Sequence, residues 1–430
     1  MLWRAEAQPT TLVLEGRLVD PGEGLDACLR VVVTEGVITA IEPGTDAALL
    51  LAPAFVDPHV HLRTPGREDE ETIATGTAAA AAGGYCAIVG MPNTDPVVDS
   101  AAVLGALIEL AREEAVVPTG YMAAITKGQR GEELTEMAEL AALGAVAFTD
   151  DGRPVASAGM MRNALRYSAV AGRPLALHEE EPTLSRDGQM HEGAVSAELG
   201  LAGWPSLAET LMIERDLAVG AYEQRPMHIM HVSAAGSVAA VRAAKARGVA
   251  VTAEVTPHHL CLTDEAVRTL DPNMKMNPPL RTQADRDALL EGLRDGTLDC
   301  VATDHAPHAR HEKDAPFEEA PFGVTGLETS FASLYMTLVE PGLVDLATLL
   351  ERMSAGPARA LGLPVPRIRV GEQANVVAID PEAEWEVLEE TFRSRSVNSW
   401  LLGERLRGRV VRTVADGRLV HDLAAVGGTA

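Results

Sequence analysis

Short apolar runs alternate with stretches rich in Ala, Leu and Glu through the middle of this 430-residue chain. Strands that alternate with helices are typical of parallel βα units, and eight such units predict a closed, TIM-like (β/α)8 barrel. The predicted strands are residues 55–57, 86–89, 118–122, 145–148, 175–177, 227–230, 251–254 and 299–302.

The two ends of the chain have a different pattern, in which short strands are separated by Gly and Pro. Such strands at both termini predict one small β-sandwich domain assembled from the two ends. We therefore expect residues 1–52 and 366–430 to form this β domain and residues 53–365 to form the barrel. The predicted terminal strands are residues 11–14, 30–33, 37–41, 374–380, 410–414 and 418–420.

Polar side chains follow most of the predicted barrel strands at their C-terminal ends. In a (β/α)8 barrel these ends meet on one face, where the active site lies. We therefore expect a common site that contains residues from several strands. The residues in question are His59, Asn93, Asp151, His178, His231, His258 and Asp304.

A pair of histidines, His59 and His61, follows the first barrel strand. Side chains alternate along a strand, so both imidazoles, and Arg63 after them, are predicted to point the same way. A lone histidine is more often a core or surface group than a ligand, but several at strand ends together predict a metal site. Imidazole and carboxylate ligands suit zinc, and a bridging carboxylate suits two ions. The six proposed ligands are His59, His61, Asp151, His178, His231 and Asp304; the neighbours His258 and His259 are expected to be structural.

The charge balance excludes several classes of partner. The formal net charge is −26, with only four lysines, so binding to nucleic acid or to an anionic membrane is not expected. An anionic substrate would need positive charge supplied by the site itself. The four cysteines are scattered, and no signal-peptide pattern is present at the N-terminus, which together favour a cytoplasmic enzyme without disulfides. The apolar stretch 78–89 contains Gly83 and Gly84, which predicts a helix, a stop and a strand rather than a membrane span.

Six motifs together resemble the class I bacterial dihydroorotases of the amidohydrolase superfamily. The resemblance extends over nearly the whole chain, including the split β domain. The motifs are Asp57-Pro58-His59-Val60-His61-Leu62-Arg63, Met91-Pro92-Asn93-Thr94, Thr149-Asp150-Asp151-Gly152, His231-Val232-Ser233, Asn277-Pro278-Pro279-Leu280-Arg281 and Ala302-Thr303-Asp304-His305-Ala306-Pro307-His308.

The resemblance implies a role for each matching residue. His59, His61 and Asp304 would hold one zinc ion, and His178 and His231 would hold the second. Asp151 would bridge the pair, with Asp150 as the rival because strand alternation cannot decide at the end of a strand. The implied substrate contacts are His61, Arg63, Asn93, Asn277, His308, Phe322 and Gly323. From the residues alone, Asn93 and Asn277 are also consistent with simple turns beside prolines.

The implied activity is the reversible hydrolysis of (S)-dihydroorotate to N-carbamoyl-L-aspartate in de novo pyrimidine (UMP) biosynthesis. A metal-bridging hydroxide would attack the ring amide, and Asp304 would act as general base and then general acid. The segment 308–323 is predicted to be a mobile active-site loop. A homodimer and an association with aspartate transcarbamoylase are the partners that the resemblance suggests.

Two alternatives stay open at this point. The first is another cyclic amide hydrolase, such as a hydantoinase or an allantoinase. Those enzymes typically carry a carboxylated lysine after the phenylalanine of the fourth strand, whereas Thr149 follows Phe148 here. The second is a non-catalytic homologue that serves as a scaffold for aspartate transcarbamoylase. Such homologues lose metal ligands, whereas this chain keeps all six candidates.

Overall fold

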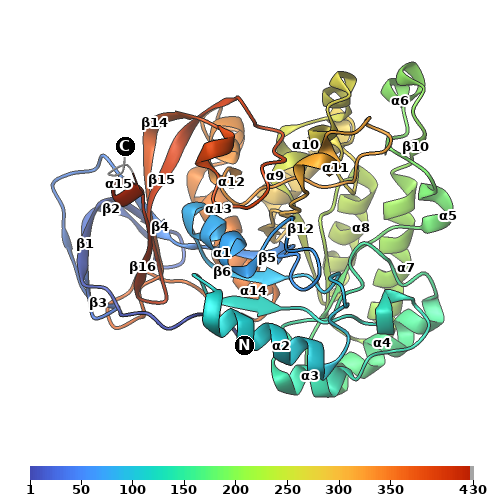
Figure 1. Ribbon diagram of the computed structural model, residues 1–430, viewed down its shortest axis with the longest axis horizontal. Coiled ribbons are helices and arrows are strands. Elements are labelled where there is room, and N and C mark those ends of the chain that lie inside the picture. The colour runs from blue at the N-terminus through green and yellow to red at the C-terminus, as the bar shows by residue number, and fades with distance from the viewer. Residues whose placement is uncertain (427–430) are drawn as a thin grey trace.

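Parallel strands form the wall of a barrel in the computed structural model, which describes residues 1–426 (Figure 1). Two hydrogen-bonded groups, β5-β6-β7 and β8-β11-β12-β13, are joined at the fourth predicted strand, residues 145–148. In the described part of the chain, that strand pairs only through Phe148, which bridges to Ala123 and Leu175. A parallel bridge between Val60 and His305 closes the ring. The predicted fold class is therefore confirmed. The strands are β5 (Phe55–Val60), β6 (Tyr85–Gly90), β7 (Thr119–Tyr121), β8 (Leu175–Leu177), β11 (Met227–Ile229), β12 (Val251–Val255) and β13 (Cys300–Val301).

Helices cover the outside of this wall, and their ends follow local sequence signals. Thr72 and Thr75 form a capping box at the start of α1 (Ile73–Ala82), which ends at Gly83. Thr282 and Asp285 do the same for α10 (Gln283–Asp295). The other covering helices are α2 (Ala101–Glu114), α3 (Met137–Leu143), α4 (Ala158–Ala171), α7 (Leu207–Glu223), α8 (Ala235–Ala246), α13 (Leu346–Met353) and α14 (Ala355–Ala360). None of the helices among residues 1–426 has the length and apolarity that crossing a membrane requires.

The barrel strands are buried on both faces, which explains their nearly continuous apolar sequences. All six residues of β5 and all six of β6 are buried. Phe55, Ile88 and Ile229 belong to one large core cluster. This packing gives the strand ends a rigid base, on which side chains of a site can be held.

The two termini build a second body beside the barrel, drawn in blue and red in Figure 1. Its seven strands are hydrogen-bonded in the order β16-β15-β14-β4-β1-β2-β3. Val37 also bridges to Gln373, next to the start of β14, which folds the sheet back over a core that contains Leu14, Val31 and Val376. The exact domain boundaries stay a prediction. The strands are β1 (Leu12–Asp20), β2 (Leu25–Thr34), β3 (Val37–Pro43), β4 (Leu50–Pro53), β14 (Val376–Glu386), β15 (Arg405–Ala415) and β16 (Arg418–Asp422).

Irregular segments with short elements follow the C-terminal ends of the barrel strands. One of them follows β13 and leads through residues 304–323 into α12. These segments surround the site described next. Their elements are α5 (Pro182–Ser185), β9 (Met190–His191), α6 (Ala194–Leu199), β10 (Gly203–Trp204), α9 (Pro257–Cys261), α11 (Arg310–Lys313) and α12 (Ser330–Leu334).

Candidate active site

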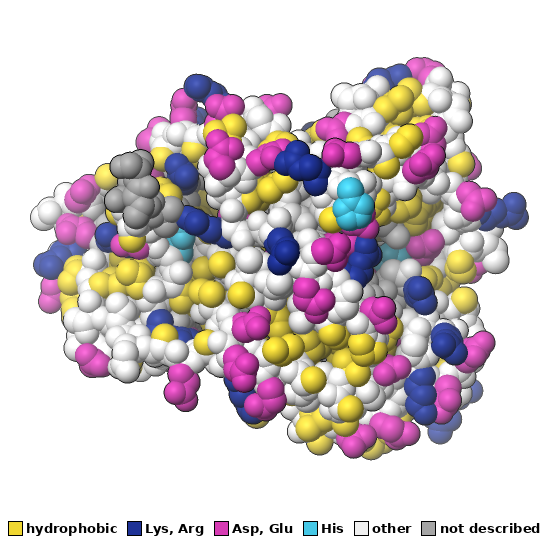
Figure 2. Space-filling view, in the orientation of Figure 1, with side chains coloured by type: hydrophobic (Ala, Val, Ile, Leu, Met, Phe, Trp, Pro, Cys, Tyr) yellow, Lys and Arg dark blue, Asp and Glu magenta, His cyan; other side chains and the backbone are white. Residues whose placement is uncertain are grey.

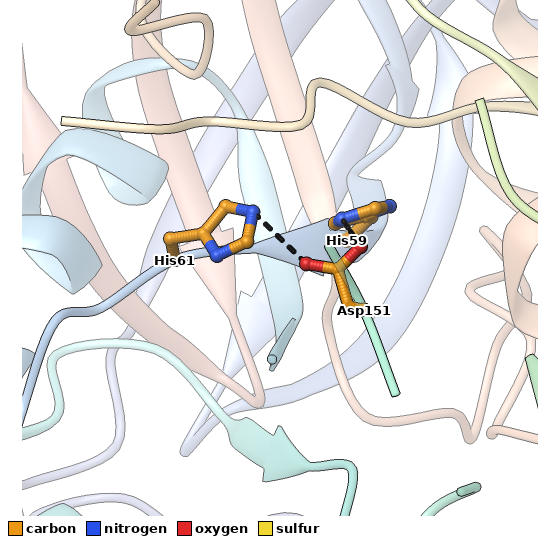
Figure 3. Close-up of side chains that lie close together, drawn as sticks. All are labelled: His59, His61 and Asp151. Atoms are coloured by element: carbon orange, nitrogen blue, oxygen red, sulfur yellow. Dashed lines mark ion pairs between the residues drawn. The ribbon is translucent and has the colours of Figure 1, made fainter. Parts of the chain in front are cut away.

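His59 and His61 lie side by side at the end of β5, with their ring centroids 5.4 Å apart (Figure 3). His59 is fully buried and His61 is 7% exposed. The two-residue spacing places both imidazoles toward the barrel mouth, as strand alternation predicts. They therefore form one side of a polar cluster on a rigid strand.

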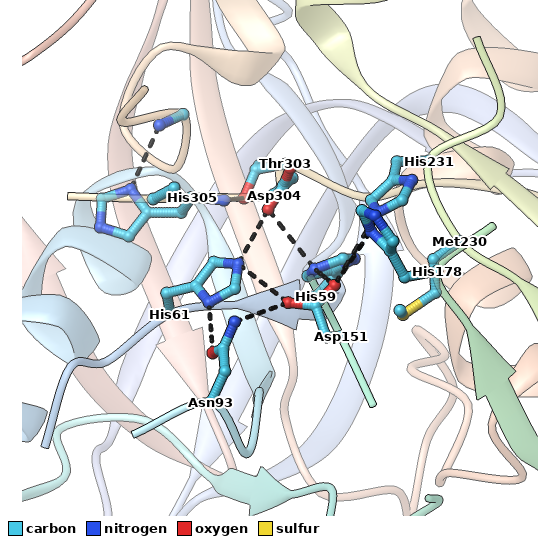
Figure 4. Close-up of polar contacts among 12 residues, drawn as sticks. His59, His61, Asn93, Asp151, His178, Met230, His231, Thr303, Asp304 and His305 are labelled. Carbon is cyan, nitrogen blue, oxygen red and sulfur yellow. Dashed lines mark hydrogen bonds and ion pairs between the residues drawn. The ribbon is translucent and has the colours of Figure 1, made fainter. Parts of the chain in front are cut away.

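The carboxylate of Asp151 lies at the centre of this cluster (Figure 4). Its Oδ1 is 3.7 Å from Nε2 of His59, and its Oδ2 is 3.6 Å from Nε2 of His61. The same Oδ1 is 3.6 Å from Nδ1 of His178 and 3.8 Å from Nε2 of His231. Asp151 is thus placed between two pairs of histidines, one from β5 and one from the ends of β8 and β11.

The neighbouring Asp150 faces away from the histidines. Its Oδ1 accepts hydrogen bonds from the backbone N–H groups of Ile125 and Thr126, at 2.8 and 3.0 Å. Burial raises the pKa of Asp150 to about 6, whereas histidine contacts hold the pKa of Asp151 well below its usual value against the effect of burial. The geometry therefore favours Asp151 over Asp150 as the residue between the two histidine pairs.

Asp304 completes the cluster from the end of β13. Its Oδ1 is 3.0 Å from Nε2 of His61 and 3.4 Å from Nε2 of His59. Burial opposes ionisation of Asp304, but the two histidines hold its pKa below the usual value. Asp304 (φ 48°) and His231 (φ 31°) both have left-handed backbones, a costly conformation that is frequent at functional sites.

The donor atoms of this cluster fit a divalent cation. Nε2 of His59 is buried and has no hydrogen-bond partner, while Nδ1 of the same ring donates to Oε1 of Glu254 at 2.8 Å. Nδ1 of His61 likewise donates to Oδ1 of Asn93 at 3.0 Å, while its Nε2 lies 3.0 Å from Oδ1 of Asp304, a second candidate ligand. A ring that donates from one nitrogen offers the lone pair of the other to a metal. Two groups of potential ligands share Asp151: His59 and His61 with Asp151, and His178 and His231 with Asp151.

A cavity of about 150 Å³ opens above the cluster. Figure 2 shows acidic side chains over much of the molecular face and histidines where the barrel half of that face is hollowed. All the residues predicted to contact substrate are brought together here. The cavity is lined by His61, Arg63, Asn93, Asp151, Gly152, His178, His231, Asn277, Asp304, Ala306, His308, Phe322 and Gly323.

Arg63 reaches the cavity for a different reason from the predicted one. β5 ends at Val60, and Arg63 has a left-handed backbone (φ 57°), so strand alternation does not set its direction. Its Nε instead donates to the carbonyl of Pro307 at 3.0 Å and lies 2.9 Å from Oε2 of Glu70. These contacts fix the guanidinium, whose side chain is 11% exposed, at the cavity wall.

Several other predicted contacts are already engaged by protein groups. Asn93 donates through Nδ2 to Oδ2 of Asp151 at 3.0 Å, so it orients the cluster as well as lining the cavity. The N–H of Gly323 donates to the carbonyl of Lys275 at 2.9 Å, and Nε2 of His308 lies 2.8 Å from the carbonyl of Phe322. By contrast, Oδ1 of Asn277 is buried without a partner. Asn277 is therefore the amide with a free acceptor.

Glu254 belongs to the site, although its sequence context predicts only a residue of the strand 251–254. It is fully buried at the end of β12 and contacts His59 and His228, with Oε2 2.8 Å from Nε2 of His228. Because a buried charge needs a partner, the presence of a glutamate inside an apolar barrel strand could have indicated that Glu254 contacts other site residues. His258 and His259 stay outside the two ligand groups; Nε2 of His259 lies 3.0 Å from the carbonyl of Pro278.

A barrel with buried histidines and aspartates at the strand ends is suited to metal-dependent hydrolysis. Two solved structures share the fold: the L-hydantoinase (dihydropyrimidinase) from Arthrobacter aurescens and the dihydropyrimidinase from Brevibacillus agri NCHU1002. Their TM-scores are 0.85 and 0.82 at 23% and 22% identity; the matches cover 98% and 96% of this chain and 96% and 95% of theirs. At this identity the likeness concerns the fold alone.

Sequence comparison narrows the class to one family. Residues 48–237 match the family model described as Dihydro-orotase-like. The dihydroorotase of Citrifermentans bemidjiense is 46% identical over 420 residues, which cover 95% of this chain and 99% of that protein. The dihydroorotase of Anaeromyxobacter dehalogenans strain 2CP-C is 46% identical over 419 residues, with 95% and 96% covered. The chain belongs to the dihydroorotase family.

Proposed function

We propose that the chain catalyses the reversible hydrolysis of (S)-dihydroorotate to N-carbamoyl-L-aspartate, a step of de novo pyrimidine synthesis, and that it needs zinc to do so. The observation that carries the proposal is the convergence of four histidines and two aspartates below one cavity. Close relatives with the name dihydroorotase over the full length support the choice of substrate.

The ligand set supports two ions per chain. His59, His61 and Asp304 would hold one, His178 and His231 would hold the other, and Asp151 would bridge them. Zinc at such a site lowers the pKa of water to about 7 and supplies a nucleophile at neutral pH. Measurement of zinc per chain by elemental analysis tests the stoichiometry, and one zinc or none at full activity would contradict it.

Asp304 is proposed to move the proton in this reaction. Hydrolysis forms a bond between the water oxygen and the ring carbonyl carbon and breaks the bond from that carbon to the ring nitrogen. Asp304 would take the proton from water and pass it to the departing nitrogen. Its Oδ1 lies 3.0 Å from Nε2 of His61 and 3.4 Å from Nε2 of His59, which supports a place for Asp304 beside the proposed ions.

The cavity wall supplies the contacts for substrate recognition. The substrate carries a carboxylate, which suits the planar guanidinium of Arg63. Asn277, with its free amide oxygen, is placed for a ring N–H, and His308 adjoins Arg63 at 3.3 Å. Phe322 and Gly323 line the same cavity and would close it over the ring.

No feature of the site favours a hydantoinase or an allantoinase. Those enzymes are expected to use a carboxylated lysine after the phenylalanine of the fourth strand, whereas Thr149 follows Phe148 here and, among residues 1–426, no lysine lines the cavity. Assays of dihydroorotate, hydantoin and allantoin side by side test the choice. We expect turnover of dihydroorotate to exceed the others by orders of magnitude; a preference for hydantoin would refute the proposal.

The proton-transfer role has its own test in Asp304→Asn. We expect kcat to fall by about 10²–10⁴-fold, because general acid–base catalysis contributes that much. The melting temperature should stay near that of the wild type, and Arg310→Gln, an exposed change in the same loop region, serves as the control. A variant with near-normal kcat would remove Asp304 from this role.

We further propose a cytoplasmic homodimer that associates with aspartate transcarbamoylase. The support is the family resemblance together with the retention of all six ligands, which argues against a purely scaffolding chain. Light scattering of the purified protein tests the dimer. Activity measured with and without the transcarbamoylase tests whether that partner is needed.

A further inference from the structure

Two of the four lysines in the chain are buried beside the active site. Lys275 is 2% exposed and Lys313 is 8% exposed. A buried ammonium is costly unless it is paired, and yet no carboxylate among the described residues forms an ion pair with either lysine. Their partners are therefore the informative feature.

Lys275 uses all three of its ammonium hydrogens on backbone carbonyls of one loop. Nζ donates to the carbonyls of Phe317, Glu318 and Ala320 at 2.7, 3.1 and 2.7 Å. It also lies 4.7 Å from the ring centroid of Phe322, a residue of the cavity wall. The ammonium thus replaces the hydrogen bonds that this irregular backbone cannot make within itself.

Lys313 lies on the loop and connects it to the segment that carries Lys275. Its Nζ donates to the carbonyls of Pro272 and Pro321, both at 2.9 Å. The N–H of Gly323 then donates to the carbonyl of Lys275 at 2.9 Å. Residues 309–323, which we call the cavity loop, are therefore joined to residues 272–275 in both directions.

Burial has a measurable consequence for both amines. It lowers the pKa of Lys275 to about 8 and that of Lys313 to about 7, and the charge of Lys275 adds to the effect on Lys313. The two charges are thus held at a free-energy cost. An arrangement that carries such a cost is expected to serve the site that it borders.

We propose that Lys275, with Lys313, is a positioning residue that holds the cavity loop closed over the substrate site. Neither lysine reaches the ligand cluster, and the loop contributes Phe322 and Gly323 to the cavity wall. Asp304 and the histidines lie outside residues 309–323, at or near the ends of barrel strands. Loss of the ammonium should therefore weaken substrate binding and leave the chemical step largely intact. The kinetic part of this inference rests on the proposed function.

The test compares Lys275→Met with Lys127→Met, which changes an exposed lysine paired with Glu133. Met keeps an unbranched side chain that is one heavy atom shorter, and it removes the three hydrogen bonds. In Lys275→Met we expect the backbone amides of residues 309–323 to exchange at least about tenfold faster, because hydrogen bonds to charged groups stabilise a folded segment by that factor or more. Exchange in the barrel strands should not change. KM for dihydroorotate should rise about tenfold or more, with kcat within about threefold. Lys127→Met should change neither.

The two readouts separate the alternatives. A raised KM with unchanged exchange would overturn the proposal, because the lysine would then act only through its charge on an anionic substrate. A loss of kcat with unchanged KM would overturn it as well. If the wild-type protein does not hydrolyse dihydroorotate, the exchange measurement still decides the loop-holding role by itself.

A second variant covers the case in which Lys275→Met does not fold. Lys313→Met removes two bonds and leaves the three of Lys275 in place. It should produce the same pattern in exchange and KM, but smaller. A folded Lys313→Met protein whose amide exchange in residues 309–323 and whose KM both equal those of the wild type would refute the proposal that the lysines hold the cavity loop.

Discussion

Replacement of Glu254 tests how the first histidine of the cluster is oriented. Oε1 of Glu254 accepts the Nδ1–H of His59 at 2.8 Å and the backbone N–H of His231 at 3.2 Å. Oε2 accepts from Nε2 of His228 at 2.8 Å. Burial opposes ionisation, yet His59 and His228 lower the pKa of Glu254 to about 2, so the group is a carboxylate. It fixes the His59 tautomer that leaves Nε2 free.

Two substitutions separate the charge of Glu254 from its hydrogen bond. In Glu254→Gln the amide oxygen can still accept the Nδ1–H of His59, and the amide NH2 then faces Nε2 of His228. His228 can accept this NH2 if it switches tautomer and donates from Nδ1 to Oγ1 of Thr252, which lies 2.8 Å away. Only the charge is lost, and we expect zinc affinity to fall about tenfold, or about 1.4 kcal/mol. In Glu254→Leu the bond is lost too, and affinity should fall about 100-fold.

The assay is competition for zinc against a chromogenic chelator, which does not depend on turnover. Glu133→Gln is the control, because it replaces an exposed carboxylate that pairs with Lys127, away from the ligands. Zinc binding by Glu254→Gln as tight as that of the wild type would show that the charge of Glu254 does not support the site. Equal losses of zinc affinity in Glu254→Gln and Glu254→Leu would show that its charge and its hydrogen bond are not separable.

Two further predictions concern substrate charge and pH. Arg63→Lys loses the two-pronged donor, so KM for dihydroorotate should rise about 10–100-fold, while any activity on uncharged dihydrouracil changes little; equal effects on both substrates would contradict carboxylate recognition. Burial raises the pKa of Glu328 to about 8, above the usual 4.5, so the folded protein holds a proton that the unfolded chain has lost between these values. Stability should therefore fall as pH rises from about 5 to 8, by up to about 1.4 kcal/mol per pH unit, and urea unfolding of Glu328→Gln should lack this component. Parallel pH profiles for the two proteins would refute it.

The pattern of apolar runs was sufficient to predict the barrel, because a parallel strand buried on both faces needs a continuous apolar sequence. The positions of His59, Asp151, His178, His231 and Asp304 also followed from sequence, since the C-terminal ends of parallel strands meet on one face. Their roles as ligands stay predictions. The two-residue spacing placed His59 and His61 together for the same local reason.

Other features were decided only by the tertiary structure. Sequence left Asp150 and Asp151 open, and the choice depends on which carboxylate the amides of residues 125 and 126 engage. Arg63 points into the cavity through a left-handed backbone and contacts from a remote loop, not through strand alternation. Lys275 and Lys313 bind backbone carbonyls, which every residue carries and no sequence pattern marks. Local periodicity determines toward which face of a strand a side chain points, whereas contacts between distant segments determine which groups surround it there.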